Sequence, residues 1–358
     1  MNERSYAAGF LGIEGVGSIR LRRLRERFGS LADAWLAPAS ELHQVHGIGA
    51  EIAQAIVAQR PEVDPGHELD RLAAAGVGLV CHWEAAFPSH LNEIADPPAV
   101  LFVRGRMPTF ERAVAIVGTR GSTVYGNRIA RAIARDLAEA GVVVVSGLAR
   151  GIDTIAHQGA LEKGTTVAVL GSSLDRVYPL QNVRLSEQIA ETGAVLSEYP
   201  LGTEPAPGQF PARNRIVSGL CQAVVVVEAR ERSGALITAD MALDQNREVM
   251  AVPGPADAPQ SRGPHRLIQQ GARLVTSAAD IMDELGWSGP NAKREAGPAP
   301  VMADDEARVY AAIEVEPTTL DQIGLKSGLS PQVINSILLM LELRALVTQL
   351  PGRLYLRR

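Results

Sequence analysis

The sequence predicts an α/β fold built on a doubly wound, mostly parallel sheet. Between about residue 112 and residue 275, short apolar runs alternate with amphipathic segments. Each run is almost continuously apolar, as expected of parallel strands covered on both faces. The segments between them, such as residues 126–140 with Ile129, Ile133 and Leu137 at helical spacing, predict the covering helices. In chain order the runs read AVAIVG, VVVVS, TVAVLG, AVLS, AVVVVEA, EVMAVPG and ARLV.

Length and composition indicate several domains and no membrane span. The chain has 358 residues, 46% hydrophobic and 21% charged, which is typical of a globular protein of two or three domains. No apolar run is long enough to cross a bilayer and the first residues are too polar for a signal peptide, so we expect a cytoplasmic protein. A net charge of −5 means that any nucleic-acid site has to be a local basic patch. Cys81 and Cys221 lack metal-ligand spacing, which predicts two buried thiols and no metal site.

Changes in texture divide the chain into three domains and a linker. Residues 1–65 read as short helices joined by glycine-containing turns, and VHGIGAEIAQAIVAQR has the form of a helix-hairpin-helix in a small SAM-like domain. The α/β region is expected over residues 66–285. Residues 286–301 are rich in Gly, Pro and Ala and predict a linker. Residues 302–358 predict a winged helix-turn-helix. Its helices are expected at 304–313, 319–326 and 331–343.

The sequence leaves open whether the two smaller domains contact DNA. In the hairpin, Gly47 and Gly49 allow amides of the next helix to approach a phosphate, but glycines that only cap helices fit equally well. The third helix of the winged domain, PQVINSILLMLELRAL, has almost no basic residues, which favours protein contact or regulation over sequence-specific reading of DNA. A cluster of arginines in the first domain favours a solvated face over a phosphate contact. These arginines are Arg22, Arg23, Arg25 and Arg27.

The chemistry of an open α/β sheet is expected in the loops that follow its strands. Nearly every such loop carries an arginine or a Gly/Ser turn with free amides beside a helix N terminus. Repeated around one edge of the sheet, this combination suits a ligand with several phosphates. Phe210 and Tyr125 add aromatic faces on which bases can stack. The loop residues concerned are Gly118, Thr119, Arg120, Tyr125, Ser146, Gly147, Arg150, Phe210, Arg213, Asn214, Arg215, Ser233 and Gly234.

Enzymatic alternatives fit the same residues less well. The first loop reads GTRGSTVYG rather than GxGxxG, Ser146 stands where a dinucleotide site has an acidic residue, and no P-loop occurs. Glu228 could serve as a catalytic or ribose-binding carboxylate, but holding the neighbouring loop is the simpler role. Ser146, Asp153 and His157 suggest a catalytic triad. The GxSxG elbow is absent, however, and a histidine bonded to Asp153 on the same helix is the simpler interpretation.

Six motifs, taken in order, resemble the DNA-processing protein A family, also called DprA or Smf. They read AIVGTRGSTVYG, VSGLARGIDTIAH, AVLGSSLDRVYPLQN, SEYPLGTEPAPGQFPARNRIVSGL, VVVVEARERSGALITADMA and EVMAVPG. The resemblance covers residues from about 87 to about 285. It implies a Rossmann-like domain that binds single-stranded DNA and has no enzymatic activity or cofactor. It also implies protection of incoming strands during natural transformation, loading of the RecA recombinase, and a homodimer formed through this domain.

Carried over by position, the resemblance assigns DNA contacts to residues in three of the loops. It adds Lys163 as the basic residue after the second helix. One departure is His265 in GPHRLIQQGA, where the family has Asn. A nucleotide-processing enzyme of the phosphoribohydrolase type is the alternative, although its P-G-G-x-G-T-x-x-E motif is absent; a DNA-binding regulator using the hairpin and winged helix is a third. The positions carried over are Arg120, Ser146, Gly147, Arg150, Phe210, Arg213, Asn214 and Arg215.

Overall fold

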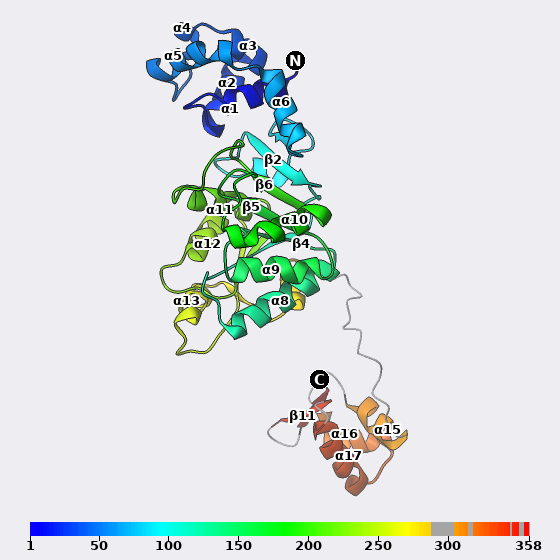
Figure 1. The fold of residues 1–358 in the computed structure, drawn as a ribbon. Helices are drawn as coiled ribbons and strands as arrows, with labels where there is room; N and C mark the ends of the chain where they lie inside the picture. Colours follow the sequence, from blue (N-terminus) through cyan, green and yellow to red (C-terminus); the bar gives the residue numbers. More distant parts are fainter. Residues whose placement is uncertain (288–303, 314–317, 344–345, 351–353, 358) are drawn as a thin grey trace. The chain divides into compact units, whose positions relative to one another are not determined.

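The computed structural model describes residues 1–287, 304–313, 318–343, 346–350 and 354–357 (Figure 1). Residues 1–288 form one compact unit and residues 289–358 a second. The expected linker at 286–301 lies almost entirely outside the described residues. None of the described helices has the length and apolar character needed to cross a membrane.

The first unit contains one sheet in the order β1-β2-β6-β5-β4-β3-β7-β8-β9. From β6 to β9 all neighbouring strands pair in parallel, which confirms the predicted doubly wound class. Each apolar run of the sequence contains one of these strands. They are β3 (Ala113–Val117), β4 (Val143–Ser146), β5 (Thr166–Leu170), β6 (Ala194–Ser197), β7 (Ala223–Val226), β8 (Glu248–Ala251) and β9 (Arg273–Leu274).

Two further strands extend the sheet on the side of β6. β2 (Val100–Gly105) pairs antiparallel with β6, and β1 (Gly78–Cys81) pairs antiparallel with β2. Sequence patterning did not predict either strand, because they lie before the repeated strand and helix alternation begins. They complete the edge of the sheet against which the N-terminal helices pack, since Leu79 and Phe102 belong to the same hydrophobic cluster as Phe10.

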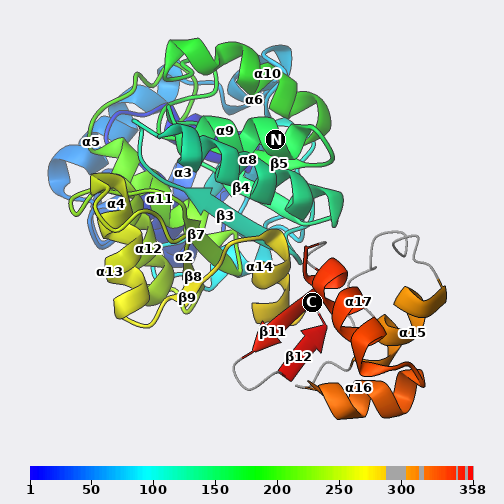
Figure 2. The same cartoon turned by 90° about the horizontal axis from the view of Figure 1, so that it is seen from below.

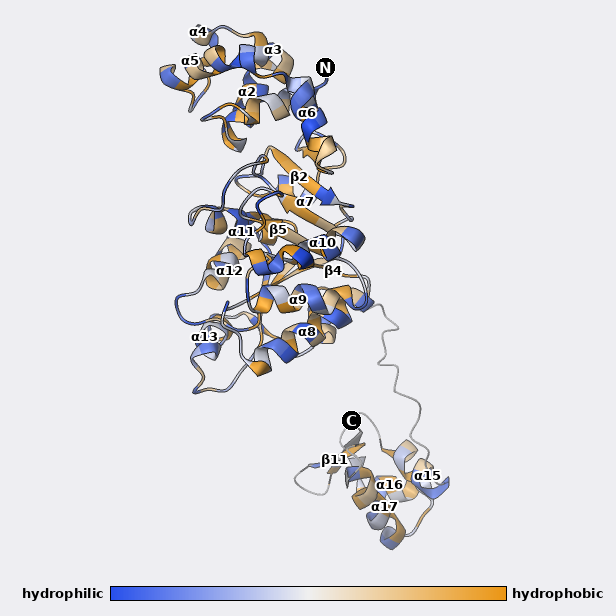
Figure 3. Ribbon diagram, in the orientation of Figure 1, coloured by the Kyte–Doolittle hydropathy of each residue, from blue (hydrophilic) through white to orange (hydrophobic). Residues whose placement is uncertain are grey.

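Helices cover both faces of the sheet (Figure 2). One face carries α8 (Val124–Glu139), α9 (Ile152–Leu161) and α14 (Ala278–Glu284), whose apolar residues share a buried cluster with β3, β4, β7 and β8. The other carries α11 (Gln209–Gly219), α12 (Gly234–Asp244) and α13 (Arg262–Gln269). The strands are hydrophobic along their length, while the helices turn hydrophilic residues outward (Figure 3). The remaining elements are α7 (Ser89–Asn92), α10 (Val183–Thr192) and the 3-10 turns Arg60–Glu62, Leu180–Asn182 and Pro259–Ser261.

Helix α8 begins at Val124, two residues before the predicted start near Gly126. The Thr123 hydroxyl accepts a hydrogen bond from the Gly126 amide at 3.1 Å and caps the helix. Tyr125 therefore belongs to the first turn of the helix and not to the loop before it.

The N-terminal domain contains two turns of the same form. Gly15 and Gly47 have φ of +83° and +84°, and each is followed by a buried residue and a second glycine that precedes a helix. One guanidinium, that of Arg20, donates to the carbonyl oxygens of Gly15 at 2.6 Å and Gly47 at 2.8 Å and so joins the two turns. The helices are α1 (Glu3–Leu11), α2 (Ser18–Phe28), α3 (Leu31–Leu36), α4 (Ala39–Leu42), α5 (Ala50–Gln59) and α6 (Pro65–Ala74).

The interpretation of the α2 arginines as a solvated face was wrong for Arg22, Arg23 and Arg25, which are partly buried, while Arg27 is exposed as expected. Arg22 donates to the Pro97 carbonyl and Arg23 to the His46 carbonyl. Arg25 pairs with a glutamate of α1 and lies 4.4 Å from the centroid of a tryptophan ring, and Arg27 donates to a glutamine. Guanidinium groups with a planar fork of donors are suited to such backbone contacts, so these side chains stabilise the domain and, through Arg22 and Arg25, attach it to the α/β region.

The second unit has the predicted winged-helix form. The helices α15 (Asp304–Ala312), α16 (Leu320–Ser327) and α17 (Pro331–Leu343) lie within a residue or two of their expected positions. The strands β10 (Thr318–Thr319), β11 (Val347–Leu350) and β12 (Leu354–Arg357) form a small antiparallel sheet. In α17, Ile334 and Leu338 are buried while Val333, Leu339 and Met340 are exposed.

Candidate nucleic-acid interface

A cavity of about 630 Å³ lies at the carboxyl ends of the parallel strands. The strand order reverses here, because β4 lies on one side of β3 and β7 on the other, and such a switch point is the usual ligand site of an open α/β sheet. Loops after β3, β4 and β7 and the first turns of α11 line it. We call it the Phe210 pocket. Of the residues predicted from the sequence, its lining contains Gly118, Arg120, Gly147, Phe210, Arg213, Asn214, Ser233 and Gly234.

Glu228 fixes the loop that carries Arg120. Its buried carboxylate accepts hydrogen bonds from the amide and hydroxyl of Thr123, and its carbonyl oxygen accepts one from the Thr119 amide at 2.7 Å. Gly151, with φ of +77°, lets the β4 loop approach closely, because a Cβ there would lie 2.3 Å from the Thr119 carbonyl oxygen. Glu228 thus holds the neighbouring loop, the simpler of the two roles considered for it.

Arg120 presents a free cation beside two aromatic rings. Its side chain is exposed and makes no hydrogen bond or ion pair with any described residue. The guanidinium carbon lies 5.8 Å from the centroid of the Phe210 ring. The centroids of the Phe210 and Tyr178 rings are 5.6 Å apart, and the planes of these two rings are tilted by 43°. Tyr178 is 46% exposed and was not singled out from the sequence. It follows the third predicted strand, so the rule used for the other loops would have found it.

Arg213 lies beneath the pocket. Only 5% of it is exposed, and its guanidinium donates to the carbonyl oxygens of Gly147, at 2.7 Å, and of Val169. Burial lowers the pKa of Arg213 to about 10, so the group remains charged at neutral pH. Burial also raises the pKa of the Asp153 carboxyl to about 6, although the charge of Arg213 and the amides of Gly147 and Ala149 oppose this. The Arg213 guanidinium therefore lies at the base of the pocket, where it is bonded to backbone carbonyls and interacts with the Asp153 carboxylate.

The first turn of α12 supplies backbone donors at the opposite wall. Ser233 caps the helix by accepting a hydrogen bond from the Ala235 amide at 3.3 Å. Gly234 is exposed, and no acidic residue occupies this first turn. An uncompensated helix N terminus facing a cavity favours an anion. Together with Arg120 it gives the pocket two places for phosphate oxygens.

Six of the predicted residues are not part of the pocket lining: Thr119, Tyr125, Ser146, Arg150, Lys163 and Arg215. Ser146 is fully buried and donates to the Ile116 carbonyl, and the Tyr125 hydroxyl donates to the Pro253 carbonyl. Arg150 is exposed in the β4 loop but is not part of the lining. Lys163 follows the end of α9, which runs back to the amino edge of the sheet, and pairs there with Glu139 at 3.1 Å.

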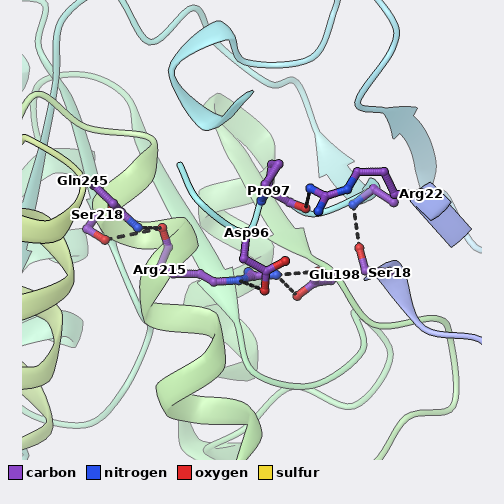
Figure 4. Close-up of polar contacts among 9 residues, drawn as sticks. Ser18, Arg22, Asp96, Pro97, Glu198, Arg215, Ser218 and Gln245 are labelled. Atoms are coloured by element: carbon purple, nitrogen blue, oxygen red, sulfur yellow. Dashed lines mark hydrogen bonds and ion pairs between the residues drawn. The ribbon is translucent and has the colours of Figure 1, made fainter. Parts of the chain in front are cut away.

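Arg215 does not line the Phe210 pocket but a second cavity, where its side chain points toward Asp96 and Glu198 (Figure 4). Its guanidinium pairs with Glu198 at 2.7 Å and Asp96 at 3.3 Å, and only 14% of the side chain is exposed. The Arg215 carbonyl oxygen accepts a hydrogen bond from the Gln245 side chain. The charge of Arg215 is therefore already neutralised by two carboxylates.

The suggested catalytic triad is not formed, and the simpler interpretation of His157 was also wrong. The His157 ring bonds through Nδ1 to the Thr166 hydroxyl at 2.7 Å, not to Asp153. That hydroxyl donates to the Val144 carbonyl, so Nδ1 of His157 is the donor in its bond to Thr166. Burial lowers the pKa of His157 to about 3. Within the described residues, no three His, Cys, Asp or Glu side chains gather as a metal site would require.

Comparisons with known proteins cover the whole chain. The model of the family described as DNA recombination-mediator protein A matches residues 78–286. Models of a helix-hairpin-helix motif and of the DprA winged helix domain match residues 6–59 and 293–353. Protein Smf of Synechocystis sp. is 36% identical over 395 residues, covering 100% of this chain and 99% of that protein. DNA processing protein DprA of Bacillus subtilis is 43% identical over 61% of this chain and 76% of its own length.

Two solved structures are similar in fold as well as in sequence. DNA processing protein A from Streptococcus pneumoniae superposes with a TM-score of 0.69 and 35% identity, covering 79% of this chain and 99% of that one. DNA processing protein A from Helicobacter pylori, described by its single-stranded DNA binding mode, gives a TM-score of 0.54 and 32% identity, covering 58% of this chain and 95% of that one.

His157 should make the fold sensitive to mild acid. The pKa of His157 is about 3 in the folded chain and 6.5 when exposed, so below pH 6.5 the unfolded state binds more protons. The unfolding free energy therefore decreases as the pH is lowered. Between about pH 7 and about pH 5 this should cost about 2 kcal/mol of unfolding free energy. Urea unfolding at several pH values measures how the unfolding free energy changes with pH, in the unmodified chain and in a His157→Leu variant. The contribution of Asp153 is the same in both proteins, so the difference between them reports on His157. Equal slopes would contradict a buried neutral histidine.

Arg215→Ala should destabilise the fold by about 2–4 kcal/mol, because it leaves the nearly buried Glu198 carboxylate without its partner. Arg176→Ala is the matched control, since Arg176 also faces two carboxylates but is 52% exposed. The control should cost less than about 1 kcal/mol. Denaturant midpoints of the two variants decide the matter, and similar losses would show that Arg215 is not a structural ion pair.

Proposed function

The chain belongs to the DNA recombination-mediator protein A family, and on that premise we propose that it binds single-stranded DNA in the Phe210 pocket. The observation that carries the proposal is the unpaired guanidinium of Arg120 beside the rings of Phe210 and Tyr178. A cation next to neighbouring aromatic rings suits a polymer that alternates phosphates with bases. The relative from Helicobacter pylori, described as binding single-stranded DNA, supports the same ligand.

Each part of the pocket has a distinct task in this proposal. Arg120 and the backbone amides at Ser233 and Gly234 bind phosphate oxygens, and Arg213 holds in place the helix that carries Phe210. Bases stack on Phe210 and Tyr178, a contact worth roughly 1–3 kcal/mol per base that tolerates any sequence. The pocket thereby binds strands without selecting their sequence.

We further propose that the protein protects incoming single strands and loads the RecA recombinase on them, acting as a homodimer and without catalysis. Support comes from family membership and from the roles of the carboxylates at the pocket: Glu228 holds a loop, and Asp153 is bonded to amides of the β4 loop. In the winged helix, α17 contains no Lys or Arg and exposes Val333, Leu339 and Met340, which supports a protein partner for that domain.

Arg120→Glu should weaken binding of an oligothymidylate at least about tenfold, because it replaces a phosphate contact by a repulsion. Fluorescence anisotropy at fixed salt measures this. Lys163→Glu is the control, since it makes the same charge change on an exposed residue at the opposite edge of the sheet. Equal losses in the two variants would indicate a general field effect, and no loss in a folded Arg120→Glu variant would remove the pocket as the site.

The salt dependence separates a strand from a small ligand. For single strands the slope of log K against log salt is about −0.7 per phosphate contacted, so Arg120→Glu should make it shallower by about that amount. A flat response in the unmodified chain, or release of free base from nucleoside monophosphates, would favour the nucleotide-processing enzyme instead.

A further inference from the structure

A second groove, of about 590 Å³, lies between the N-terminal helices and the α/β core. We call it the hairpin groove. Its walls come from both turns of the double hairpin, from the loop after β6 and from α11. The residues that matter below are Ile19, Arg20, Arg23, Tyr199, Ala212 and Arg215.

Hydrogen bonds between the N-terminal domain and the α/β core lie next to the groove (Figure 4). The Ser18 hydroxyl accepts a hydrogen bond from the Ala99 amide at 2.5 Å, and Arg22 donates to the Pro97 carbonyl at 3.4 Å. These bonds attach the first turn of α2 to the segment before β2. The first hairpin is therefore bonded both to the second hairpin, through Arg20, and to the α/β core.

The charge of the groove is positive. Three arginines and two carboxylates line it, and both carboxylates, Asp96 and Glu198, pair with Arg215. Arg20 and Arg23 donate only to backbone carbonyls and have no carboxylate partner among the described residues. These two guanidinium groups, which form no ion pair, attract an anion, and the donor fork of each leaves N–H groups for a phosphate.

The floor of the groove is suited to a base. Ile19 is 42% exposed despite its apolar side chain, and the half-buried Tyr199 lies across the groove in the loop after β6. As at the Phe210 pocket, an aromatic ring lies in the same cavity as arginines that form no ion pair.

Helix α11 lies between the two cavities and contributes residues to the lining of both. Phe210 and Asn214 line the Phe210 pocket, whereas Ala212 and Arg215 line the hairpin groove. Between them Pro211 and Ala212 are exposed, and neither carries a charge that would repel a phosphate. A strand leaving the Phe210 pocket can pass over this turn into the groove without displacing a described ion pair.

We propose that bound single-stranded DNA continues from the Phe210 pocket over the first turn of α11 into the hairpin groove. There Arg20 and Arg23 contact phosphates, and a base lies against Tyr199 and Ile19. This inference rests on the proposed function, because it extends the same strand. It gives the hairpin domain a contact with the same single strand that the Phe210 pocket binds.

Strand length tests the inference. Anisotropy titrations of the full chain with oligothymidylates of about 6 and about 20 nucleotides distinguish a ligand confined to the Phe210 pocket from one that reaches both sites. Arg23→Gln should weaken binding of the long strand about fourfold and reduce its salt slope by about 0.7, with the short strand unaffected. Arg27→Gln is the matched control: Arg27 lies on the same helix, also donates one hydrogen bond within the domain, and is not part of the groove.

A second variant adds charge without removing a contact. Ala212→Glu places a carboxylate on the exposed turn and should also weaken the long strand, whereas Ala73→Glu on α6 should not. The inference is overturned if Arg23→Gln and Ala212→Glu bind the long strand as tightly as the unmodified chain, or if Arg23→Gln weakens only duplex binding. Neither result bears on the proposed function. That function fails separately if the unmodified chain does not bind the oligothymidylate, or if a folded Arg120→Glu variant binds it as tightly as the unmodified chain.

Discussion

The buried guanidinium of Arg213 fixes helix α11, and both cavities depend on that helix. Its bonds to the carbonyls of Gly147 and Val169 join α11 to the ends of β4 and β5. On the other side of the helix, Arg215 joins it to Glu198 and Asp96. Arginine suits this task because it stays charged when buried and directs several donors at once. The result places Phe210 over one cavity and Ala212 over the other.

This arrangement explains how an acidic protein can bind a polyanion. The net charge is −5, so the chain as a whole repels DNA and binding depends on local charge. Arg213 is bonded to backbone carbonyls of the fold, and Arg215 is paired with two of its carboxylates. Arg120, at the edge of the Phe210 pocket, keeps its charge for a ligand. The division between structural and free arginines determines where a strand can be held.

Sequence patterning predicted the parallel strands, the helices and the loops that meet at the switch point. It did not predict which arginines face the ligand, because the segment around Arg213 was taken as a loop, whereas α11 begins at Gln209. On a helix, residues two apart point about 200° from each other, so Arg213 and Arg215 cannot share one site. Recognising the helix would have separated them. Lys163 was carried over from a resemblance, and only the sheet topology shows that it lies at the other edge.

Hydrogen exchange of the full chain, with and without an oligothymidylate, tests the central claim most directly. The account predicts that the strand slows exchange of amides in the loop after β3, in the first turns of α11 and α12, and beside the turn at Gly47. Amides near Lys163 should exchange at the same rate with and without DNA. Protection confined to the winged helix or to the amino edge of the sheet would contradict it.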